Sequence, residues 1–263
     1  MKVVIFAGGM GTRISEESHL KPKPMIEIGE KPMLWHIMKM YSHYGFNEFI
    51  ICLGYKGHKI KEYFLNYFLY NSDVSIDLNT NNVEIHKSFK DDFKVTLVDT
   101  GLYTKTAGRL KMVRKYLNDE TFMLTYGDGV SDINLKELLV YHKSHGKKAT
   151  VTAVQPDGKF GGMDINEKSR VTLFKEKPKG DGTWINGGFF VLEPSVFEYL
   201  EGDMNEVMWE DSPLENLALD GELSAYKHSG YWKCMDALRD KIELEDAWHS
   251  ENPPWKTWDV KDN

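Results

Sequence analysis

The feature that most constrains this chain is a glycine-rich stretch that directly follows a short apolar run. Residues 3–6 read Val-Val-Ile-Phe, and residues 7–13 read Ala-Gly-Gly-Met-Gly-Thr-Arg. The apolar run predicts a buried strand, and glycines after such a strand let several backbone N–H groups approach a phosphate closely. Arg13 and Lys23 add positive charge nearby, which favours an anionic ligand. The stretch therefore predicts an α/β fold with a phosphate-binding loop after its first strand.

Two familiar phosphate loops do not fit this stretch. A P-loop ends in Gly-Lys followed by Ser or Thr, whereas here Gly11 is followed by Thr12 and Arg13. The dinucleotide fingerprint G-x-G-x-x-G begins at Gly9 and Gly11 but fails at Ile14. The alternatives that remain are a different phosphate-binding loop and a tight turn with an unrelated arginine.

Composition narrows the class of protein. The chain has 263 residues, of which 41% are hydrophobic, which suffices for one large α/β domain. The net charge of −7 argues against a general nucleic-acid binder. Two cysteines without a Cys-x-x-Cys spacing predict a protein of the reducing cytoplasm. No apolar run reaches membrane-spanning length and no leader pattern is visible at the N-terminus, so no membrane association is expected.

The order of elements predicts a mostly parallel sheet with helices on both faces. Strands are expected at 2–6, 49–53, 121–125 and 149–154, and helices from about 32, 57, 106 and 135, so the two types alternate over the first 155 residues. Residues 71–94 have short alternating apolar runs and predict a β insertion or hairpin, with another strand at 94–100. Residues 156–263 are more β-rich and end in a helix near 236–248.

Two aspartates are the candidate metal ligands. Asp128 lies between two glycines directly after the strand predicted at 121–125, at the sheet edge where α/β folds bind ligands. A carboxylate at a phosphate site usually acts through Mg²⁺, and the alternative is an Asx-turn residue. Asp236 is the candidate second ligand, although its place at a loop-to-helix transition also suits a helix N-cap.

Two further segments suit a sugar phosphate. Glu176, Lys177 and Pro178 end a predicted strand, and the proline holds Lys177 extended. A lysine beside a glutamate can bind an anion while the acid accepts sugar hydroxyls, and an ordinary surface pair is the alternative. Asn186 precedes two glycines, which predict a turn that also lets backbone approach a polar ligand.

The combination of residues favours a reaction in which the phosphate of one substrate attacks a phosphate of another. The chain lacks a G-x-S-x-G elbow and an H-E-x-x-H pair. A glycine loop, Arg13, Lys23 and metal-bound aspartates supply positioning and charge neutralisation, which are what phosphoryl transfer requires. The second pKa of a sugar phosphate is near ~6, so its attacking oxygen is ionised at neutral pH without a base.

With these residues in view, the chain resembles the sugar-nucleotide pyrophosphorylases, nucleotidyltransferases that join a nucleoside triphosphate to a sugar 1-phosphate. The glycine loop together with Lys23 and Pro24 carries the family likeness. Longer segments are similar to the glucose-1-phosphate cytidylyltransferase branch of that family. These segments are residues 15–17, 21–25, 27–29, 34–39, 126–130, 176–182, 185–190 and 254–258.

The resemblance implies one nucleotidyltransferase domain over 1–263, with a Rossmann-like nucleotide-binding core at 1–155 and a smaller β-rich sugar-binding part with the C-terminal helix at 156–263. It implies that CTP and glucose 1-phosphate give CDP-glucose and pyrophosphate with Mg²⁺, for the dideoxyhexoses of O-antigen lipopolysaccharide. Arg13 and Lys23 are then the catalytic residues, and Asp128 and Asp236 hold the metal. The nucleotide-binding residues are Ala7, Gly8, Gly9, Met10, Gly11, Thr12, Arg13, Lys23, Thr104, Arg109 and Gly127, and the sugar-phosphate-binding residues are Glu176, Lys177 and Asn186.

Departures from the branch leave alternatives open. Residue 107 is Ala where the branch has Gly, and residue 10 is Met where it has Leu. The extra methyl of Ala107 lies near the expected base site, so UTP and dTTP are alternative nucleotides. A non-catalytic sugar-nucleotide sensor on the same fold is a further alternative, which the presence of Lys23 and Asp128 disfavours. The resemblance also implies a homo-oligomer, with a hexamer as the form typical of the branch.

Overall fold

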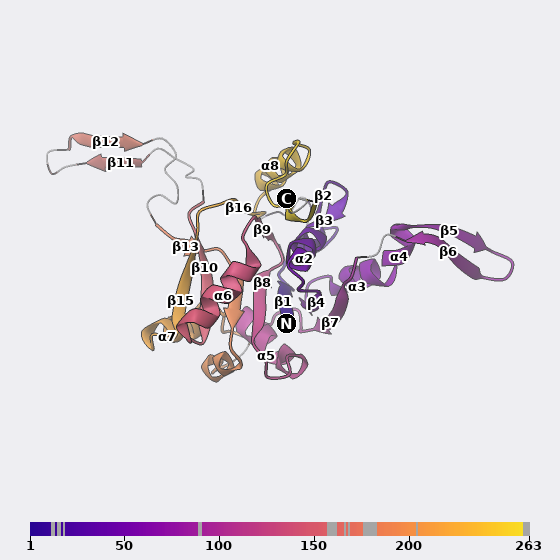
Figure 1. Ribbon diagram of the computed structural model, residues 1–263, viewed down its shortest axis with the longest axis horizontal. Helices are drawn as coiled ribbons and strands as arrows, with labels where there is room; N and C mark the ends of the chain where they lie inside the picture. The colour runs from indigo at the N-terminus through magenta and orange to yellow at the C-terminus, as the bar shows by residue number, and fades with distance from the viewer. Residues whose placement is uncertain are drawn as a thin grey trace.

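A computed structural model describes residues 1–11, 14, 17, 19–88, 91–156, 162–165, 167, 169–175, 183–203 and 205–259. Within them an eight-stranded sheet forms the centre of the molecule (Figure 1). Its strands are β1 (Lys2–Ala7), β4 (Glu48–Leu53), β7 (Lys94–Asp99), β8 (Phe122–Tyr126), β10 (Ala149–Val154), β13 (Ile185–Asn186), β14 (Phe190–Leu192) and β15 (Leu223–His228).

The sheet is mixed and mainly parallel, as predicted. Its order is β13-β10-β14-β8-β1-β4-β7, and β15 pairs with β10. The pairs β1·β4, β1·β8, β4·β7 and β10·β15 are parallel, and only β14 and β13 run antiparallel to their described neighbours. Strands from the second half of the chain therefore extend the same sheet that the first half begins.

Helices cover both faces because β1 is apolar on both sides. Val3 and Ile5 belong to one buried cluster, whereas Val4 and Phe6 belong to another, as the two-residue period of a strand requires. The first cluster includes side chains of α2 (Met33–His43), α6 (Leu135–His145) and α8 (Leu238–Trp248); the second includes side chains of α5 (Thr106–Val113) and α7 (Ser212–Leu219). Both faces are thus withdrawn from water, which is typical of parallel sheets.

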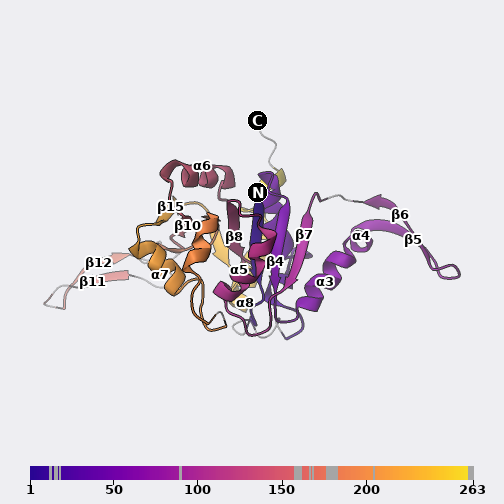
Figure 2. The same ribbon diagram turned by 90° about the horizontal axis from the view of Figure 1, so that it is seen from below.

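Two hairpins project from this body on opposite sides (Figures 1 and 2). The first, β5 (Ser72–Asp77) with β6 (Asn82–Ser88), confirms the β insertion predicted near 71–94, and β7 returns the chain to the central sheet. The second is β11 (Gly162–Ile165) with β12 (Val171–Lys175). Two short helices, α3 (Gly57–Leu65) and α4 (Tyr67–Tyr70), lead into the first hairpin.

Shorter elements complete the described chain. The strand pairs are β2 (Glu27–Ile28) with β3 (Lys31–Pro32), and β9 (Gly129–Ser131) with β16 (Trp232–Cys234). The 3-10 helices are η2 (Lys23–Met25), η3 (Arg114–Tyr116), η5 (Pro194–Tyr199) and η6 (Thr257–Asp259). Among the residues that the structure describes, no helix combines the length and the apolar character needed to cross a bilayer.

The C-terminal helix α8 confirms the helix predicted at 236–248, and the segment after it packs on α2. Trp255 is fully buried, and its Nε1 donates to Nδ1 of the equally buried His36 at 3.4 Å. The other ring nitrogen of His36, Nε2, lies 2.8 Å from the carbonyl oxygen of Ile28, so the neutral ring donates there and accepts from Trp255. Burial lowers the pKa of His36 to about 4.

Candidate active site

The ends of four parallel strands place their following loops along one edge of the sheet. The glycine loop follows β1, Gly54 follows β4, Thr100 follows β7, and Gly127 with Asp128 follows β8. Because these strands run in the same direction, their carboxyl ends meet at the edge where open α/β sheets bind ligands.

The side chain of Arg109 contacts the glycine loop and forms a hydrogen bond with its backbone. The Gly8 carbonyl accepts from the backbone N–H of Tyr55 at 3.2 Å and from Arg109 Nη2 at 3.1 Å. A Cβ on Gly8 would overlap the Arg109 guanidinium, so a side chain has no room at this position. Gly11 has a φ of +62°, a conformation that favours glycine. Glycine is therefore required at position 8 because a side chain has no room, and it is favoured at position 11 because of the backbone conformation.

Arg109 is only 4% exposed, and its guanidinium binds the chain itself. Burial lowers the pKa of this group, and hydrogen bonds to oxygen acceptors compensate for its lost hydration. Nη1 donates to Leu53 O (2.9 Å), Thr100 Oγ1 (2.6 Å) and Gly101 O (2.9 Å), and Nη2 donates to Gly8 O and to Leu102 O (3.4 Å). The side chain thus ties the ends of β1, β4 and β7 together.

Lys23 lies at the N-terminus of η2, and its ammonium joins the two predicted metal ligands. Nζ lies 2.5 Å from Asp128 Oδ2 and 2.7 Å from Asp236 Oδ1, and the lysine side chain is only 13% exposed. Burial alone would lower the pKa of Lys23, but the nearby carboxylate of Asp128 and the other acidic groups raise it above its ordinary value. Lys23 therefore keeps its positive charge at neutral pH.

The short strand pair β9·β16 brings Asp236 to Asp128. Cys234 lies opposite Gly129, and the backbone N–H of Met235 donates to the carbonyl of Asp128 at 2.9 Å. The carboxylate that caps α8 is that of Asp240, which accepts from the backbone N–H groups of Asp236 and Ala237 at 2.9 Å. The N-cap alternative for Asp236 is therefore wrong, because Ala237 is the N-cap residue, and the carboxylate of Asp236 faces Lys23 in the site.

Three side chains here form a group that can hold a cation. One ligand atom each from Asp128, Cys234 and Asp236 lies within 4.8 Å of the others, and all three residues are half-buried. Two carboxylate oxygens match the ligand preference of a hard divalent cation. The donor set therefore fits a divalent metal.

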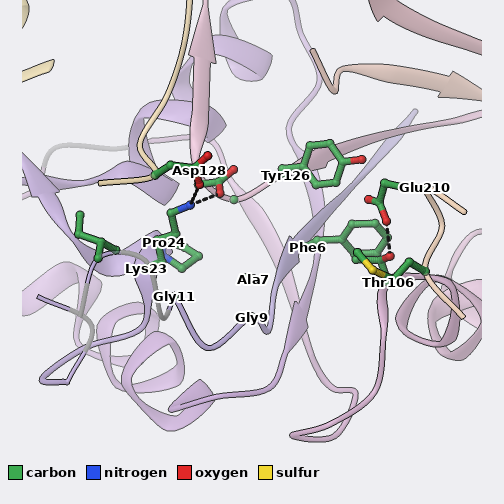
Figure 3. A pocket seen from close by; sticks show the side chains of 14 residues that line it. Phe6, Ala7, Gly9, Gly11, Lys23, Pro24, Thr106, Tyr126, Asp128 and Glu210 are labelled. Atoms are coloured by element: carbon green, nitrogen blue, oxygen red, sulfur yellow. Dashed lines mark hydrogen bonds and ion pairs between the residues drawn. The ribbon is translucent and has the colours of Figure 1, made fainter. Parts of the chain in front are cut away.

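A cavity of about 320 Å³ runs along the glycine loop (Figure 3). Lys23 and Asp128 lie on one side of the view, and Thr106 with Glu210 lies on the other. Thr106 Oγ1 donates to Glu210 Oε2 at 2.7 Å and accepts from the backbone N–H of Trp209 at 2.7 Å. The lining residues are Phe6, Ala7, Gly9, Gly11, Ile14, Lys23, Pro24, Thr106, Tyr126, Gly127, Asp128, Met208, Glu210 and Asp236.

A second cavity of about 240 Å³ adjoins the first. The two cavities share Tyr126, Asp128 and Asp236 as lining residues, so the carboxylates lie between them. Asn186 lines the second cavity, and its Nδ2 donates to the Tyr126 hydroxyl at 3.2 Å. Trp232 and Cys234, from β16, form another part of its wall.

Of the predicted site residues that the structure describes, seven line the first cavity and Asn186 lines the second, whereas Gly8 and Arg109 line neither. Thr104 instead donates its hydroxyl to Asn205 at 3.4 Å and lies outside the lining of both cavities, as does Met10, which is 41% exposed. Thr12, Arg13, Glu176 and Lys177 lie outside the described residues. The sequence reasoning missed Glu210, Thr106 and Tyr126. Of these three, Tyr126 could have been found from the sequence, because it directly precedes the predicted site residues Gly127 and Asp128.

Comparison with known proteins now identifies the chain. The profile of the nucleotidyl transferase family matches residues 2–235. The chain belongs to this family. This nucleotidyl transferase is 56% identical over 260 residues to glucose-1-phosphate cytidylyltransferase of Salmonella typhi, a match that covers 98% of the chain and 100% of the relative. It is 48% identical over 258 residues to the probable glucose-1-phosphate cytidylyltransferase of Bacillus subtilis, again covering 98% of the chain and 100% of the relative.

Solved structures confirm the fold of this nucleotidyl transferase. HddC from Yersinia pseudotuberculosis aligns with a TM-score of 0.67 at 24% identity, over 94% of this chain and 99% of that chain. The predicted mixed, mostly parallel sheet flanked by helices is therefore confirmed. The predicted resemblance to glucose-1-phosphate cytidylyltransferases is also confirmed, because the identity extends over the whole length of the curated relatives.

Proposed function

We propose that this nucleotidyl transferase makes CDP-glucose and pyrophosphate from CTP and glucose 1-phosphate. The observation that carries the proposal is the meeting of Lys23, Asp128 and Asp236 between two adjoining cavities. Two substrates that react through their phosphates need such an arrangement, with one substrate in each cavity and the charged groups between them. The identity of the substrates rests on the full-length similarity to the two bacterial cytidylyltransferases.

In this reaction an oxygen of the sugar phosphate bonds to the α-phosphorus of CTP. The bond from that phosphorus to the bridging oxygen breaks, and pyrophosphate leaves. The attacking phosphate is already ionised at neutral pH, so the chain need not supply a base. The backbone N–H groups near Gly9 and Gly11 hold the triphosphate, and Lys23 stabilises the negative charge that develops around the α-phosphorus.

Asp128 and Asp236 would hold Mg²⁺ in this proposal. Both carboxylates line both cavities, and their oxygens suit a hard cation. The chemistry that a bound ion would supply there is neutralisation of phosphate charge and Lewis-acid stabilisation. Lys23 contacts the same two carboxylates, so the lysine and the ion belong to one charge-compensating group.

Glu210 supports cytosine as the base. Its carboxylate lies at the side of the first cavity away from Lys23 (Figure 3), where Thr106 orients one of its oxygens. A carboxylate accepts hydrogen bonds only, and the exocyclic amino group of cytosine is a donor that pairs well with it. Uracil and thymine present a carbonyl oxygen at that position, so Glu210 would disfavour UTP and dTTP.

Pyrophosphate release from the purified protein tests this function. Glucose 1-phosphate and Mg²⁺ are supplied with CTP, UTP, dTTP, ATP or GTP in parallel. Strong release with CTP alone is the expected result. Release with UTP or dTTP instead would keep the chemistry and refute the base assignment. Tight binding of CDP-glucose by folded protein without any release would favour the sensor alternative.

We further propose that the chain forms one domain and a homo-oligomer. A single domain is supported by β13, β14 and β15, which join the sheet that contains β1. An oligomer is supported by exposed apolar side chains on α3, α4 and the first hairpin, which are Leu65, Phe68, Tyr70, Ile76 and Leu78. Light scattering coupled to size-exclusion chromatography measures the assembly directly; a purely monomeric mass would refute the oligomer.

A further inference from the structure

Cys234 is the member of the three-donor group that phosphate chemistry does not require. Magnesium binds oxygen and has little affinity for a thiol, yet Cys234 Sγ belongs to the group whose ligand atoms lie within 4.8 Å of one another. The ammonium of Lys23 lies beside this group, in contact with both carboxylates. A cationic side chain thus already contacts two of the three donors.

Strand β16 aims Cys234 at this place. Side chains alternate along a strand, and Lys233 points the other way, where Nζ pairs with Asp240 at 3.3 Å and also with Glu243. Trp232 and Cys234 share the opposite side and line the second cavity. The residue paired with Cys234 is Gly129, which has no side chain to separate the thiol from Asp128.

We propose that Cys234 makes this group a binding site for thiophilic divalent cations, of the class of Zn²⁺ and Cd²⁺, with its sulfur as third ligand beside Asp128 and Asp236. Zn²⁺ combines thiolate with carboxylate ligands and commonly takes three protein side chains plus one open position. Such an ion binds with loss of the thiol proton and displaces Lys23 from the carboxylates. It therefore competes with the hard cation for the same two carboxylates.

This inference rests on the proposed function only in taking Asp128 and Asp236 as metal ligands, and it is tested without turnover. Cd²⁺ is titrated into the full-length protein after chelator treatment, and the ultraviolet charge-transfer band of a cadmium–thiolate bond is followed. The expected result is a band that saturates at one ion per chain. Cys234→Ser should abolish the band and weaken Cd²⁺ binding at least tenfold, because a soft ligand is lost.

The chain offers a matched control in its other cysteine. Cys52 is fully buried between β1 and β7, and its thiol lies 3.9 Å from the carbonyl of Arg109. Cys52→Ala should keep both the band and the Cd²⁺ affinity. Mg²⁺ affinity, measured by competition against Mn²⁺ with electron paramagnetic resonance, should change less than about twofold in Cys234→Ser.

Two outcomes would overturn the inference. One is a wild-type protein that binds Cd²⁺ without the band; the other is a Cys234→Ser protein that binds Cd²⁺ as tightly as wild type. Cys234→Ala provides a second variant if the serine protein fails to fold. Absence of the band together with normal pyrophosphate release would refute this inference alone, whereas a Cys234-dependent band in a protein that releases no pyrophosphate would refute the proposed function alone.

Discussion

Replacing Arg109 with Met separates two roles that this residue could have. The resemblance predicts that Arg109 contacts the nucleotide, whereas the structure directs its guanidinium to five oxygen acceptors of the chain. Methionine keeps the unbranched stem and removes the charge and every donor. If the tether is the main role, the free energy of unfolding must fall; if nucleotide contact is the main role, only substrate affinity changes.

The decrease in the free energy of unfolding of Arg109→Met depends on which of the five acceptors keep another hydrogen-bond donor. The Gly8 carbonyl keeps the N–H of Tyr55, and the Leu53 carbonyl keeps the N–H of Thr100 at 2.9 Å. The other acceptors lie on residues 100–102, of which Leu102 is exposed to water whereas Thr100 is fully buried. The five lost bonds are worth at least about 1 kcal/mol each, and removing a buried charge offsets part of the loss. We expect a decrease of about 3 kcal/mol.

Urea unfolding followed by tryptophan fluorescence measures this decrease, with Arg114→Met as the control. Arg114 is an exposed arginine five positions along the chain that pairs with Asp119 at 3.5 Å and lies 5.1 Å from the centre of the Phe197 ring. Its loss should change the free energy of unfolding by less than about 1 kcal/mol. Arg109→Lys, which retains the charge but not the fork, should lose an intermediate amount. A decrease below about 1 kcal/mol in Arg109→Met would refute the tether, most clearly if KM for CTP rose at the same time.

Four other changes test the site and the core. Lys23→Met should lower kcat at least about 100-fold with unchanged circular dichroism, because it removes charge from the transition state; a rate near wild type would exclude Lys23 from the mechanism. Asp236→Asn should raise the Mg²⁺ concentration for half-maximal rate about tenfold, and an unchanged Mg²⁺ titration would reject it as a ligand. Glu210→Gln should lower the ratio of kcat/KM for CTP over UTP about tenfold, and an unchanged ratio would mean that another group reads the base. The pKa of His36 is lowered to about 4 in the folded protein, so below pH 6.5 the unfolded chain binds a proton that the folded protein does not. The free energy of unfolding should therefore be insensitive to His36 above pH 6.5 and should fall by about 3 kcal/mol between pH 6.5 and 4. A His36→Gln protein with the same pH dependence would contradict this.

The sequence predicted the parts of the site that depend on neighbours along the chain. The glycine loop and Asp128 each follow an apolar strand directly, so the rule that ligands bind at the carboxyl ends of parallel strands placed both correctly. Lys23 comes only twelve positions after Gly11, so the sequence also placed it near the glycine loop. These predictions needed only strand periodicity and the shared direction of β1 and β8.

What the sequence did not predict depends on contacts between distant segments. Cys234 reaches the carboxylates only because β16 pairs with β9 in one register, and a shift of one residue would turn its side chain away. Glu210 reaches the first cavity through a hydrogen bond to Thr106 on α5. The inward direction of Arg109 is likewise set by the carbonyls around it, which periodicity alone does not reveal.

In the proposed mechanism a lysine and a metal act on the same two carboxylates, and the charges of the site give a reason for this. Among the described residues, Asp128 and Asp236 together with Lys23 carry one net negative charge between the cavities, and this charge repels substrates that are themselves anions. A bound divalent cation reverses that sign and makes the place attractive to phosphate. Lys23 holds the two carboxylates together in the described structure, and in the proposed mechanism a bound metal would make the place competent for anionic substrates. A thiophilic ion bound as proposed to the Cys234 thiolate would attract phosphate less than Mg²⁺, because the thiolate cancels one of the two positive charges that the ion brings.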